Sequence, residues 1–340
     1  MVTGDCAHMI GSVTSPAEES NGPIAESEIF APGLLSGKVA LVTGGGTGLG
    51  KATALELSRC GAAVTIAGRR AEVLEGAVSE IGAAIGADAD RTDRLGGSDG
   101  GDRTVGAGAT AGVDEVGNAG RVDWIAGDVR EQEDAERLIA TVLERHGKLD
   151  VLVNNAGGQY FTPAEGITAK GWQAVWRLNV DGMLNMAEAA FERALGPAGA
   201  GTIVNVTLSP HHGMPGMAHS GAARAAVEAL TRELAGRWAA KGVAVTAVAA
   251  GHFDTEALEK YPASLRAGMA RSVPLQRLGA VQEHAWLVTL LASPLGRAFS
   301  GSTVTLDGAR DNWFGPWPPA GLADAGGEVP TEERKGTATT

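Results

Sequence analysis

The chain has 340 residues, a formal net charge of −12 and a hydrophobic content of 44%. The acidic balance leaves no basic surface that would neutralise phosphates, which argues against nucleic acid or an anionic membrane as the main partner. Its two cysteines, Cys6 and Cys60, are too few for a disulfide framework or a structural zinc site, and no apolar run approaches the ~18 residues of a membrane span. We therefore expect a cytoplasmic protein that needs no metal.

Both ends of the chain differ in composition from the part between them. Residues 1–30 and 315–340 are rich in Gly, Pro and polar residues and lack apolar periodicity, which predicts a disordered N-terminal extension and a flexible C-terminal tail. Between residues 31 and 314, strand-like apolar runs alternate with helical patterns. The runs are Val39–Val42, Ala63–Ala67, Asp123–Ala126, Val151–Val153, Thr202–Val206, Val243–Val248 and Val304–Leu306. They predict an α/β fold, a single doubly wound Rossmann-type domain with a seven-stranded parallel sheet.

One stretch interrupts this alternation. From Gly82 to Gly120 the sequence is dominated by Gly, Ala, Asp and Thr, and it offers too little apolar area to offset the entropy of ordering it. We interpret residues 84–120 as a disordered surface insertion between the second helix and the third strand. A segment that binds a partner is the alternative, because long loops without structure are either functional or linkers.

A glycine-rich loop follows the first predicted strand. It reads Thr43-Gly44-Gly45-Gly46-Thr47-Gly48-Leu49-Gly50 and leads into a helical pattern from Lys51. Glycines allow a tight turn and close approach of the backbone to a pyrophosphate, which then lies at the helix N-terminus where the N–H groups are unpaired. Because the loop lies between a strand and a helix, it indicates a dinucleotide site.

The end of the second strand bears on the choice of cofactor. A site that prefers NAD(H) places Asp or Glu there to bind the ribose hydroxyls, but this chain reads Gly68-Arg69-Arg70. The planar guanidinium of Arg69 can bind a 2′-phosphate with two hydrogen bonds. The sequence therefore favours NADP(H), with NAD(H) possible; the alternative is that both arginines are solvated at the start of the next helix.

Further motifs follow the glycine loop in a fixed order. They are Asp128-Val129, Asn154-Asn155-Ala156-Gly157 and Asn179 in Leu178-Asn179-Val180-Asp181-Gly182. Together they resemble the pattern of the short-chain dehydrogenase/reductase superfamily over roughly Leu34 to Ala309, apart from the insertion. The resemblance implies a homodimer or homotetramer and a proton-relay water held by Asn179. The cofactor-binding residues that we expect are Thr43, Gly44, Thr47, Gly48, Leu49, Gly50, Arg69, Asp128, Val129, Asn155, Ala156, Gly157, Arg224, Gly251 and Thr255.

Within the superfamily the sequence is most similar to peroxisomal trans-2-enoyl-CoA reductases and to bacterial dehydrogenases of acyclic-terpene (citronellol) utilisation. Three passages carry this likeness: Ala31-Pro32-Gly33-Leu34-Leu35, Gly157-Gly158-Gln159-Tyr160 with Pro163-Ala164-Glu165, and His219-Ser220-Gly221-Ala222-Ala223-Arg224-Ala225. The likeness implies a small-molecule substrate, an acyl-CoA thioester or a terpenoid.

The third passage is also where the chain departs from the superfamily. Most members have Tyr-x-x-x-Lys on this helix, with the Tyr as acid/base, whereas here the two positions are Ser220 and Arg224. The position of the superfamily's catalytic Ser falls near Leu208, with Thr207 and Ser209 as the nearby hydroxyls. An aliphatic hydroxyl is a poor base at neutral pH and Arg does not lose its proton, so ordinary alcohol oxidation is in doubt.

Reduction of an enoyl thioester needs no such base. The developing enolate oxygen needs hydrogen-bond donors, which Ser220 and Arg224 can supply, and the α-carbon takes a proton from water or from an acid such as Tyr160. The expected catalytic residues are therefore Ser220, Arg224, Asn179, Tyr160 and Thr207. Tyr160 is alternatively a packing residue.

Three functions stay open from the sequence. An NADP(H)-dependent reductase of a 2-enoyl-CoA-type thioester, with a place in fatty acid metabolism, is favoured over a terpenoid or medium-chain alcohol dehydrogenase; a nucleotide-binding protein without catalysis is the third. Other candidate site residues have packing or solvated roles as their alternative. These are the relay histidines His211, His212 and His219, the pocket residues Met214, Met217 and 252–273, and the possible CoA-binding residues Lys260, Arg266 and Arg271.

Overall fold

The computed structural model describes residues 27, 29–31, 33–95, 121–209, 211, 216–259 and 263–312. The expected C-terminal tail at 315–340 lies outside the described residues, as do nearly all of residues 1–30. Residues 96–120 of the expected insertion lie outside them too.

The described chain forms one parallel sheet. Its strands are β1 (Val39–Thr43), β2 (Ala63–Gly68), β3 (Val122–Ala126), β4 (Val151–Asn154), β5 (Gly201–Leu208), β6 (Val243–Ala250) and β7 (Thr303–Leu306). Their order is β3-β2-β1-β4-β5-β6-β7, and every neighbouring pair is parallel. The predicted seven-stranded doubly wound fold is confirmed, and each strand covers the run from which it was predicted.

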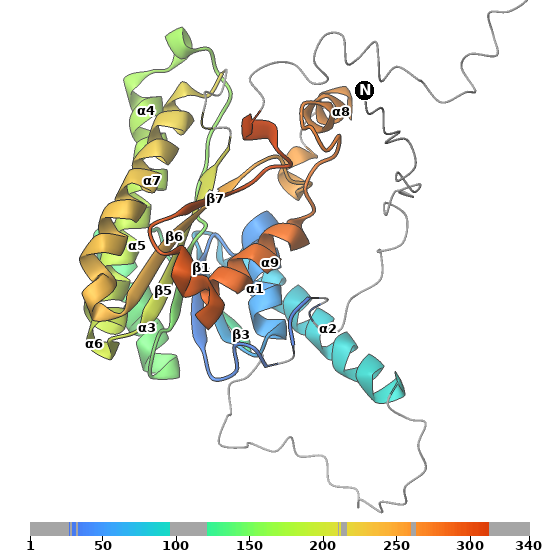
Figure 1. The fold of residues 1–340 in the computed structure, drawn as a ribbon, viewed down its shortest axis with the longest axis vertical. Helices are drawn as coiled ribbons and strands as arrows, with labels where there is room; N and C mark the ends of the chain where they lie inside the picture. Colours follow the sequence, from blue (N-terminus) through green and yellow to red (C-terminus); the bar gives the residue numbers. More distant parts are fainter. Residues whose placement is uncertain are drawn as a thin grey trace, which may run out of the picture.

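Two hydrophobic cores cover the two faces of the sheet, because successive side chains of a strand point to opposite faces. On β1, Val39 and Leu41 belong to one core, while Ala40 and Val42 belong to the other. The first core packs against α3 (Gln132–His146), α4 (Ala169–Trp176), α5 (Gly182–Ala190) and α7 (Ala218–Trp238). The second packs against α1 (Gly48–Arg59), α2 (Ala71–Leu95) and α9 (Val281–Ala292). Figure 1 shows α1 and α9 together on one side of the sheet and α3, α5 and α7 on the other.

Helix α2 corrects one sequence expectation. The helix continues to Leu95, so residues 84–95 are helical where the expected insertion was to begin. The physical reason is local: the segment Gly82-Ala83-Ala84-Ile85-Gly86-Ala87-Asp88-Ala89 is rich in alanine, which has the highest helix propensity, and it continues a helix that is already formed. Likewise α1 begins at Gly48, ahead of the Lys51 start suggested by the sequence.

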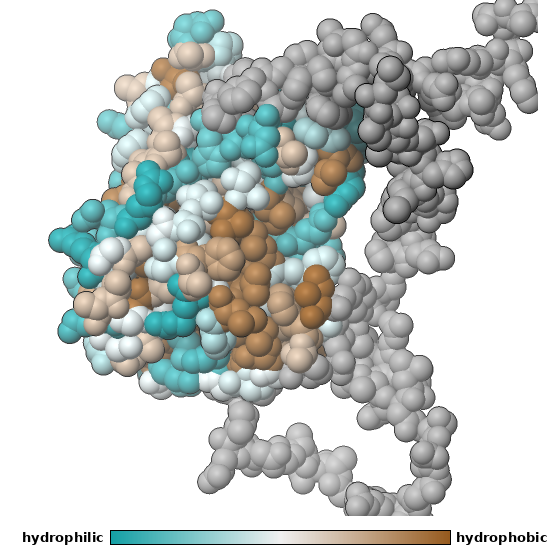
Figure 2. All heavy atoms as spheres, in the orientation of Figure 1, coloured by the Kyte–Doolittle hydropathy of each residue, from teal (hydrophilic) through white to brown (hydrophobic). Residues whose placement is uncertain are grey.

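The surface of the described chain carries one visible gathering of apolar side chains. Figure 2 shows it in the centre of the face, over α9. The short 3-10 segment η6 (Pro294–Phe299) follows α9, and its Leu295 and Phe299 are among the large hydrophobic residues that stay exposed. Among the described helices, none is long and apolar enough to cross a bilayer.

The strand order determines where a ligand binds. Strand β1 lies between β2 and β4, and the connections leave it in opposite directions, so a crevice opens beyond the carboxyl ends of β1 and β4. The glycine loop follows β1 at Thr43, and the Asn155-Ala156-Gly157 turn follows β4 at Asn154. The motifs singled out from the sequence therefore meet at one edge of the sheet.

A buried histidine of α9 connects this helix to α1, the helix that follows the glycine loop. His284 of α9 is fully buried; its Nδ1 lies 3.4 Å from the Thr53 hydroxyl of α1, and its ring packs edge-on against Phe253. Its Nε2 has no partner among the described residues. Burial lowers the pKa of His284 to about 4, so the ring is neutral at pH 7.

This histidine predicts an acid dependence of stability. Because its pKa is lower in the folded than in the unfolded protein, the unfolded state binds the extra proton, and stability falls as the pH drops from about 6.5 to about 4. A His284→Gln variant should have a shallower slope in this window, by up to about 1.4 kcal/mol per pH unit. Urea unfolding at several pH values measures both slopes; identical slopes would contradict the assignment.

Candidate active site

Hydrogen bonds join the turns that follow β1 and β4. The Thr43 hydroxyl accepts hydrogen bonds from the backbone N–H groups of Asn155 at 3.1 Å and Ala156 at 3.0 Å. In return, the Asn155 side-chain amide donates to the carbonyls of Thr43 at 3.1 Å and Gly44 at 3.2 Å. Thr43, Asn155 and Ala156, expected to bind cofactor, thus hold the floor of the crevice together.

The glycines of the first loop are required by close contacts. Gly44 has φ +65°, and a Cβ there would lie 2.9 Å from the Ala156 Cα. A Cβ at Gly50 would lie 2.3 Å from the Gly44 carbonyl oxygen. Thr47 precedes the first turn of α1, but its side chain makes no capping hydrogen bond to the helix N–H groups. The loop thus has the shape and the donors that a pyrophosphate requires.

The adenosine end of the crevice lies beyond β2 and β3. Arg69 is exposed after β2 and has no hydrogen bond or ion pair to another described residue. Asp128, after β3, binds Arg130 through the backbone N–H at 3.1 Å and through the guanidinium. The hydrogen bond from Arg130 lowers the pKa of Asp128, to which the charge of Arg69 adds. Val129 is buried, and a Cβ on Gly182 would lie 2.8 Å from its Cγ2.

At the nicotinamide end, Asn179 lies in a single π-helical turn, Arg177–Asp181. Its amide donates to the carbonyls of Gly158 at 2.9 Å and Val175 at 2.7 Å, and its Oδ1 accepts from the Gly158 N–H at 3.1 Å. A π turn breaks the regular pattern of helical hydrogen bonds and is common at functional sites. Asn179 therefore fixes the turn after β4 from the helix side.

Arg224 of α7 reaches the same turn. A Cβ added to Gly157 would lie 2.7 Å from Arg224 Nη2 and 2.9 Å from Asn179 Oδ1, so the guanidinium lies against this glycine. Its Nη1 donates to the Val206 carbonyl at 3.0 Å, while its buried Nε has no partner in the described part of the chain. Burial lowers the pKa of Arg224 to about 10, which leaves it charged at neutral pH. The half-buried guanidinium, with its buried Nε, can therefore take a further polar partner from a ligand.

Ser220, one turn before Arg224 on α7, is fully buried. Its hydroxyl donates to the Gln159 side-chain carbonyl at 3.2 Å. Gln159 is exposed after the turn that follows β4, so its amide N–H₂ group stays available to a ligand in the crevice. The structure thus brings together Ser220, Arg224 and Asn179, and it adds Gln159, to which no role was assigned from the sequence.

Thr207 binds a different set of polar residues from those around Ser220 and Arg224. Its hydroxyl donates to Glu228 Oε1 at 2.9 Å, and the same carboxylate lies 2.8 Å from His211 Nε2. His211 Nδ1 contacts Asp311. Burial opposes the charge on His211, but Asp311 and Glu228 outweigh it and raise its pKa. This polar network connects β5, α7 and the segment after β7; Ser209 binds Asp307 within the same region.

Tyr160 packs against two helix starts. Its ring lies edge-on to His219 with centroids 4.5 Å apart, and its hydroxyl lies so close to Gly171 that a Cβ there would be 2.0 Å away. His219 is buried, neither ring nitrogen has a described partner, and burial lowers its pKa. The packing alternative for Tyr160 gains support from these contacts, and its catalytic role stays a prediction.

The loop after β6 lies between the end of β7 and the glycine loop. The Gly251 N–H donates to the Leu306 carbonyl at 2.9 Å, and a Cβ at Gly251 would lie 2.5 Å from the Asp307 Cβ. Thr255 lies against the glycine loop, with its Cγ2 3.6 Å from the position of a Cβ on Gly48. Gly251 is thus held against the end of β7, and Thr255 lies next to the glycine loop; their binding of cofactor stays a prediction.

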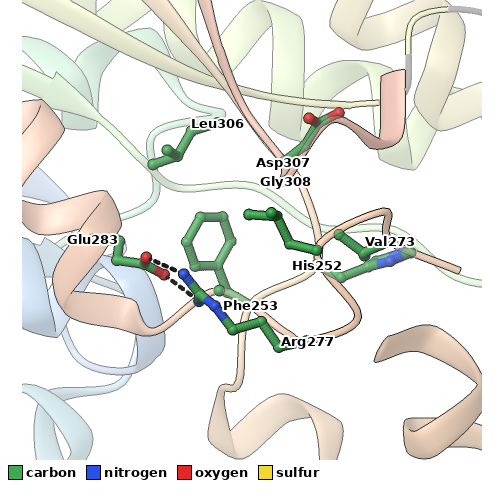
Figure 3. Close-up of a pocket in the computed structure, with 10 residues that line it drawn as sticks. His252, Phe253, Val273, Arg277, Glu283, Leu306, Asp307 and Gly308 are labelled. Carbon is green, nitrogen blue, oxygen red and sulfur yellow. Dashed lines mark hydrogen bonds and ion pairs between the residues drawn. The ribbon is translucent and has the colours of Figure 1, made fainter. Parts of the chain in front are cut away.

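A pocket lies behind this loop. Figure 3 shows the Phe253 ring in the middle of its lining, near Leu306 and the Arg277–Glu283 ion pair. His252 and Val273, the ends of the expected substrate loop, both line it. Met217, by contrast, is buried, and Arg266 and Arg271 lie on α8 (Ala263–Arg271). His212, Met214 and Lys260 lie outside the described residues.

Family comparisons agree with this geometry. Residues 103–309 match the family model of Enoyl-(Acyl carrier protein) reductase, and residues 38–95 match that of short chain dehydrogenase. The chain belongs to the short-chain dehydrogenase/reductase family. Membership implies an NAD(P)(H) cofactor, and the glycine loop, the orphaned Nε of Arg224 and the exposed Arg69 fit such a dinucleotide.

Similar members of the family have related names. The probable 2,4-dienoyl-CoA reductase of Bacillus subtilis (strain 168) is 33% identical over 83% of this chain and 98% of its own length. The peroxisomal 2,4-dienoyl-CoA reductase of Arabidopsis thaliana is 30% identical over 82% of this chain and 86% of its own. A solved structure, the citronellol catabolism dehydrogenase AtuB of Pseudomonas aeruginosa PAO1, is 36% identical, with TM-score 0.66 and coverage of 84% and 99%.

These relatives refine the resemblance drawn from the sequence. The bacterial citronellol dehydrogenases are represented by AtuB, whereas the curated relatives above are 2,4-dienoyl-CoA reductases where trans-2-enoyl-CoA reductases had been expected. The names 2,4-dienoyl-CoA reductase and trans-2-enoyl-CoA reductase both describe enzymes that reduce a C=C bond of an acyl-CoA thioester.

The sequence missed Gln159, Glu228 and Glu256 as site residues. Gln159 directly follows the Asn-Asn-Ala-Gly turn, and Glu228 lies four residues after Arg224 on the same helical face, so both had a positional signal. Glu256 follows Thr255, and nothing in its neighbourhood indicated that it contacts α1.

The contact between Gly157 and Arg224 predicts that one methyl group added at residue 157 weakens cofactor binding. Gly157→Ala should push the guanidinium away and weaken NADPH binding about tenfold or more, the value of a charge-assisted hydrogen bond. Gly158→Ala is the matched control, because its Cβ would meet only Leu178, at 3.1 Å. Fluorescence titration with NADPH measures both; equal affinities in the two variants would count against the site.

Proposed function

We propose that the protein is an NADP(H)-dependent oxidoreductase that reduces the C=C bond of a 2-enoyl-CoA-type thioester. The observation that carries this proposal is the pair of Ser220 and Arg224 on α7, with Ser220 buried and the half-buried Arg224 charged beside Gly157. This pair can stabilise a developing negative charge on oxygen, whereas neither an aliphatic hydroxyl nor a guanidinium is a good base toward an alcohol.

Each residue has a role in this chemistry. A nicotinamide cofactor held in the crevice would supply the hydride that the β-carbon takes. Gln159, positioned by Ser220, donates its amide N–H to the thioester oxygen, and the Arg224 cation stabilises the enolate that forms there. Arg224 and Asn179 lie side by side, so they can hold the water that protonates the α-carbon. The names of the B. subtilis and A. thaliana relatives support this class of substrate.

One alternative function has a specific observation in its favour. AtuB, 36% identical over nearly its whole length, is a citronellol catabolism dehydrogenase, which favours a terpenoid alcohol or aldehyde as substrate. A catalytically inactive nucleotide-binding protein is the alternative of another class. NADPH oxidation with 2-enoyl-CoA and 2,4-dienoyl-CoA, compared with NADP⁺ reduction by citronellol, separates the three; turnover of citronellol alone would overturn the proposal.

The two residues of α7 should respond differently to substitution. Arg224→Ala should weaken NADPH binding and lower turnover, because it removes the half-buried cation that takes part in both steps. Ser220→Ala should leave NADPH affinity unchanged and lower kcat about 10- to 1000-fold, because it frees Gln159 from its position. Steady-state kinetics and NADPH titration test both, and parental behaviour of both variants would remove α7 from the mechanism.

Arg69 should determine the preference for the phosphorylated cofactor. It is exposed at the end of β2, at the position where sites that prefer NAD(H) have a carboxylate that would repel a 2′-phosphate. Because this chain has an arginine there, NADPH should bind more tightly than NADH. Arg69→Asp should reverse or abolish this preference, while Arg70→Asp, one residue further, serves as control. Equal affinity of the parent protein for both cofactors would contradict the prediction.

A further inference from the structure

Glu256 places a carboxylate at the N-terminus of α1. It opens the short 3-10 segment η5 (Glu256–Leu258) in the loop after β6. Its Oε2 accepts a hydrogen bond from the Gly48 N–H at 3.1 Å, and its Oε1 accepts one from Lys51 Nζ at 2.9 Å. Lys51 also binds Glu80 of α2 at 2.9 Å. The loop after β6 is thereby linked to the glycine loop through a negative charge.

The Gly48 N–H is one of the donors that a pyrophosphate at the start of α1 would use. Gly48 is the first residue of α1, where the unpaired N–H groups and the helix dipole favour an anion, and it belongs to the glycine motif. The hydrogen bond from Lys51 holds the pKa of Glu256 below its usual value, so the carboxylate is charged at neutral pH. Two anions cannot share the Gly48 N–H, so Glu256 and a pyrophosphate compete for it.

The backbone around Glu256 shows which part of the loop is held elsewhere. The Asp254 N–H donates to the Gly279 carbonyl at 2.9 Å, and the Gly279 N–H donates to the His252 carbonyl at 2.8 Å. Residues 252–254 are therefore fixed to Gly279, whereas Glu256 lies beyond this attachment and is held at α1 by its own side chain. Its side chain is half exposed, which leaves it room to move into solvent.

We infer that Glu256 is a determinant of cofactor affinity: its carboxylate competes with the cofactor pyrophosphate for the start of α1 and withdraws when the dinucleotide binds. The inference rests on the dinucleotide site of the family and not on the identity of the substrate. Because the pyrophosphate is common to both cofactors, the competition affects NADPH and NADH alike. The withdrawal also frees the loop that carries Thr255 toward the nicotinamide end.

Substitution of Glu256 by its neutral isostere tests the inference. Glu256→Gln, and independently Glu256→Ala, should lower the Kd for NADPH and for NADH by about twofold to tenfold, the range that a charge near a helix N-terminus contributes. Glu259→Gln is the matched control, because it removes the same charge from an exposed position three residues away. Isothermal titration calorimetry on the full chain measures all of them.

A fragment without the pyrophosphate provides the second control. Adenosine 2′-monophosphate should bind parent and Glu256→Gln protein with the same affinity, since it does not reach the Gly48 N–H. Unchanged or weaker NADPH binding by both Glu256 variants would overturn the inference, as would an equal gain in Glu259→Gln. Since binding is measured without substrate, failure to turn over enoyl thioesters would count against the proposed function alone.

Discussion

The hydrogen bonds between Thr43 and the Asn155-Ala156 turn are the constraint on which the rest of the site depends. They connect the ends of β1 and β4, where the strand order reverses, and they bring two loops from distant parts of the chain into contact. Gly44 allows this contact because a side chain there would collide with the Ala156 backbone, and Gly50 because a side chain there would collide with the Gly44 carbonyl and the Asn155 side chain. The dinucleotide crevice is thus a consequence of how closely two turns approach each other.

The chemistry proposed for the site depends on one cation, Arg224. Arg224 lies against Gly157 and Asn179, and its buried Nε has no partner among the described residues, although burial of a polar group of a cation is costly. Such a group is tolerated where a ligand completes its interactions, and in the function proposed above a ribose and an enolate oxygen would do so. On that proposal, Ser220 and Arg224 in place of the usual Tyr and Lys suit a site that stabilises negative oxygen better than one that exchanges a proton with an alcohol.

The outer part of the site carries charges of opposite sign: arginines at the adenosine end and the carboxylate of Glu256 at the start of α1. Arg69 and Arg130 make the adenosine end positive, whereas Glu256 places a carboxylate where the pyrophosphate binds. Cofactor affinity is then a balance between attraction at one end and competition at the other. The network of Glu228, His211 and Asp311 lies apart from this axis and ties the segment after β7 to α7.

The sequence by itself determined the fold and the location of the site, because strands, glycine turns and the Asn-Asn-Ala-Gly motif are encoded by neighbouring residues. The expected start of the disordered insertion at residue 84 was wrong, because composition suggested disorder where alanine propensity extends α2 to Leu95. Only the tertiary structure decided which side chains meet. Thr207, an expected catalytic residue, binds Glu228, Ser220 binds Gln159, and Glu256 reaches Gly48 across 208 residues. Such contacts depend on how helices and loops pack on the sheet, and no local pattern specifies them.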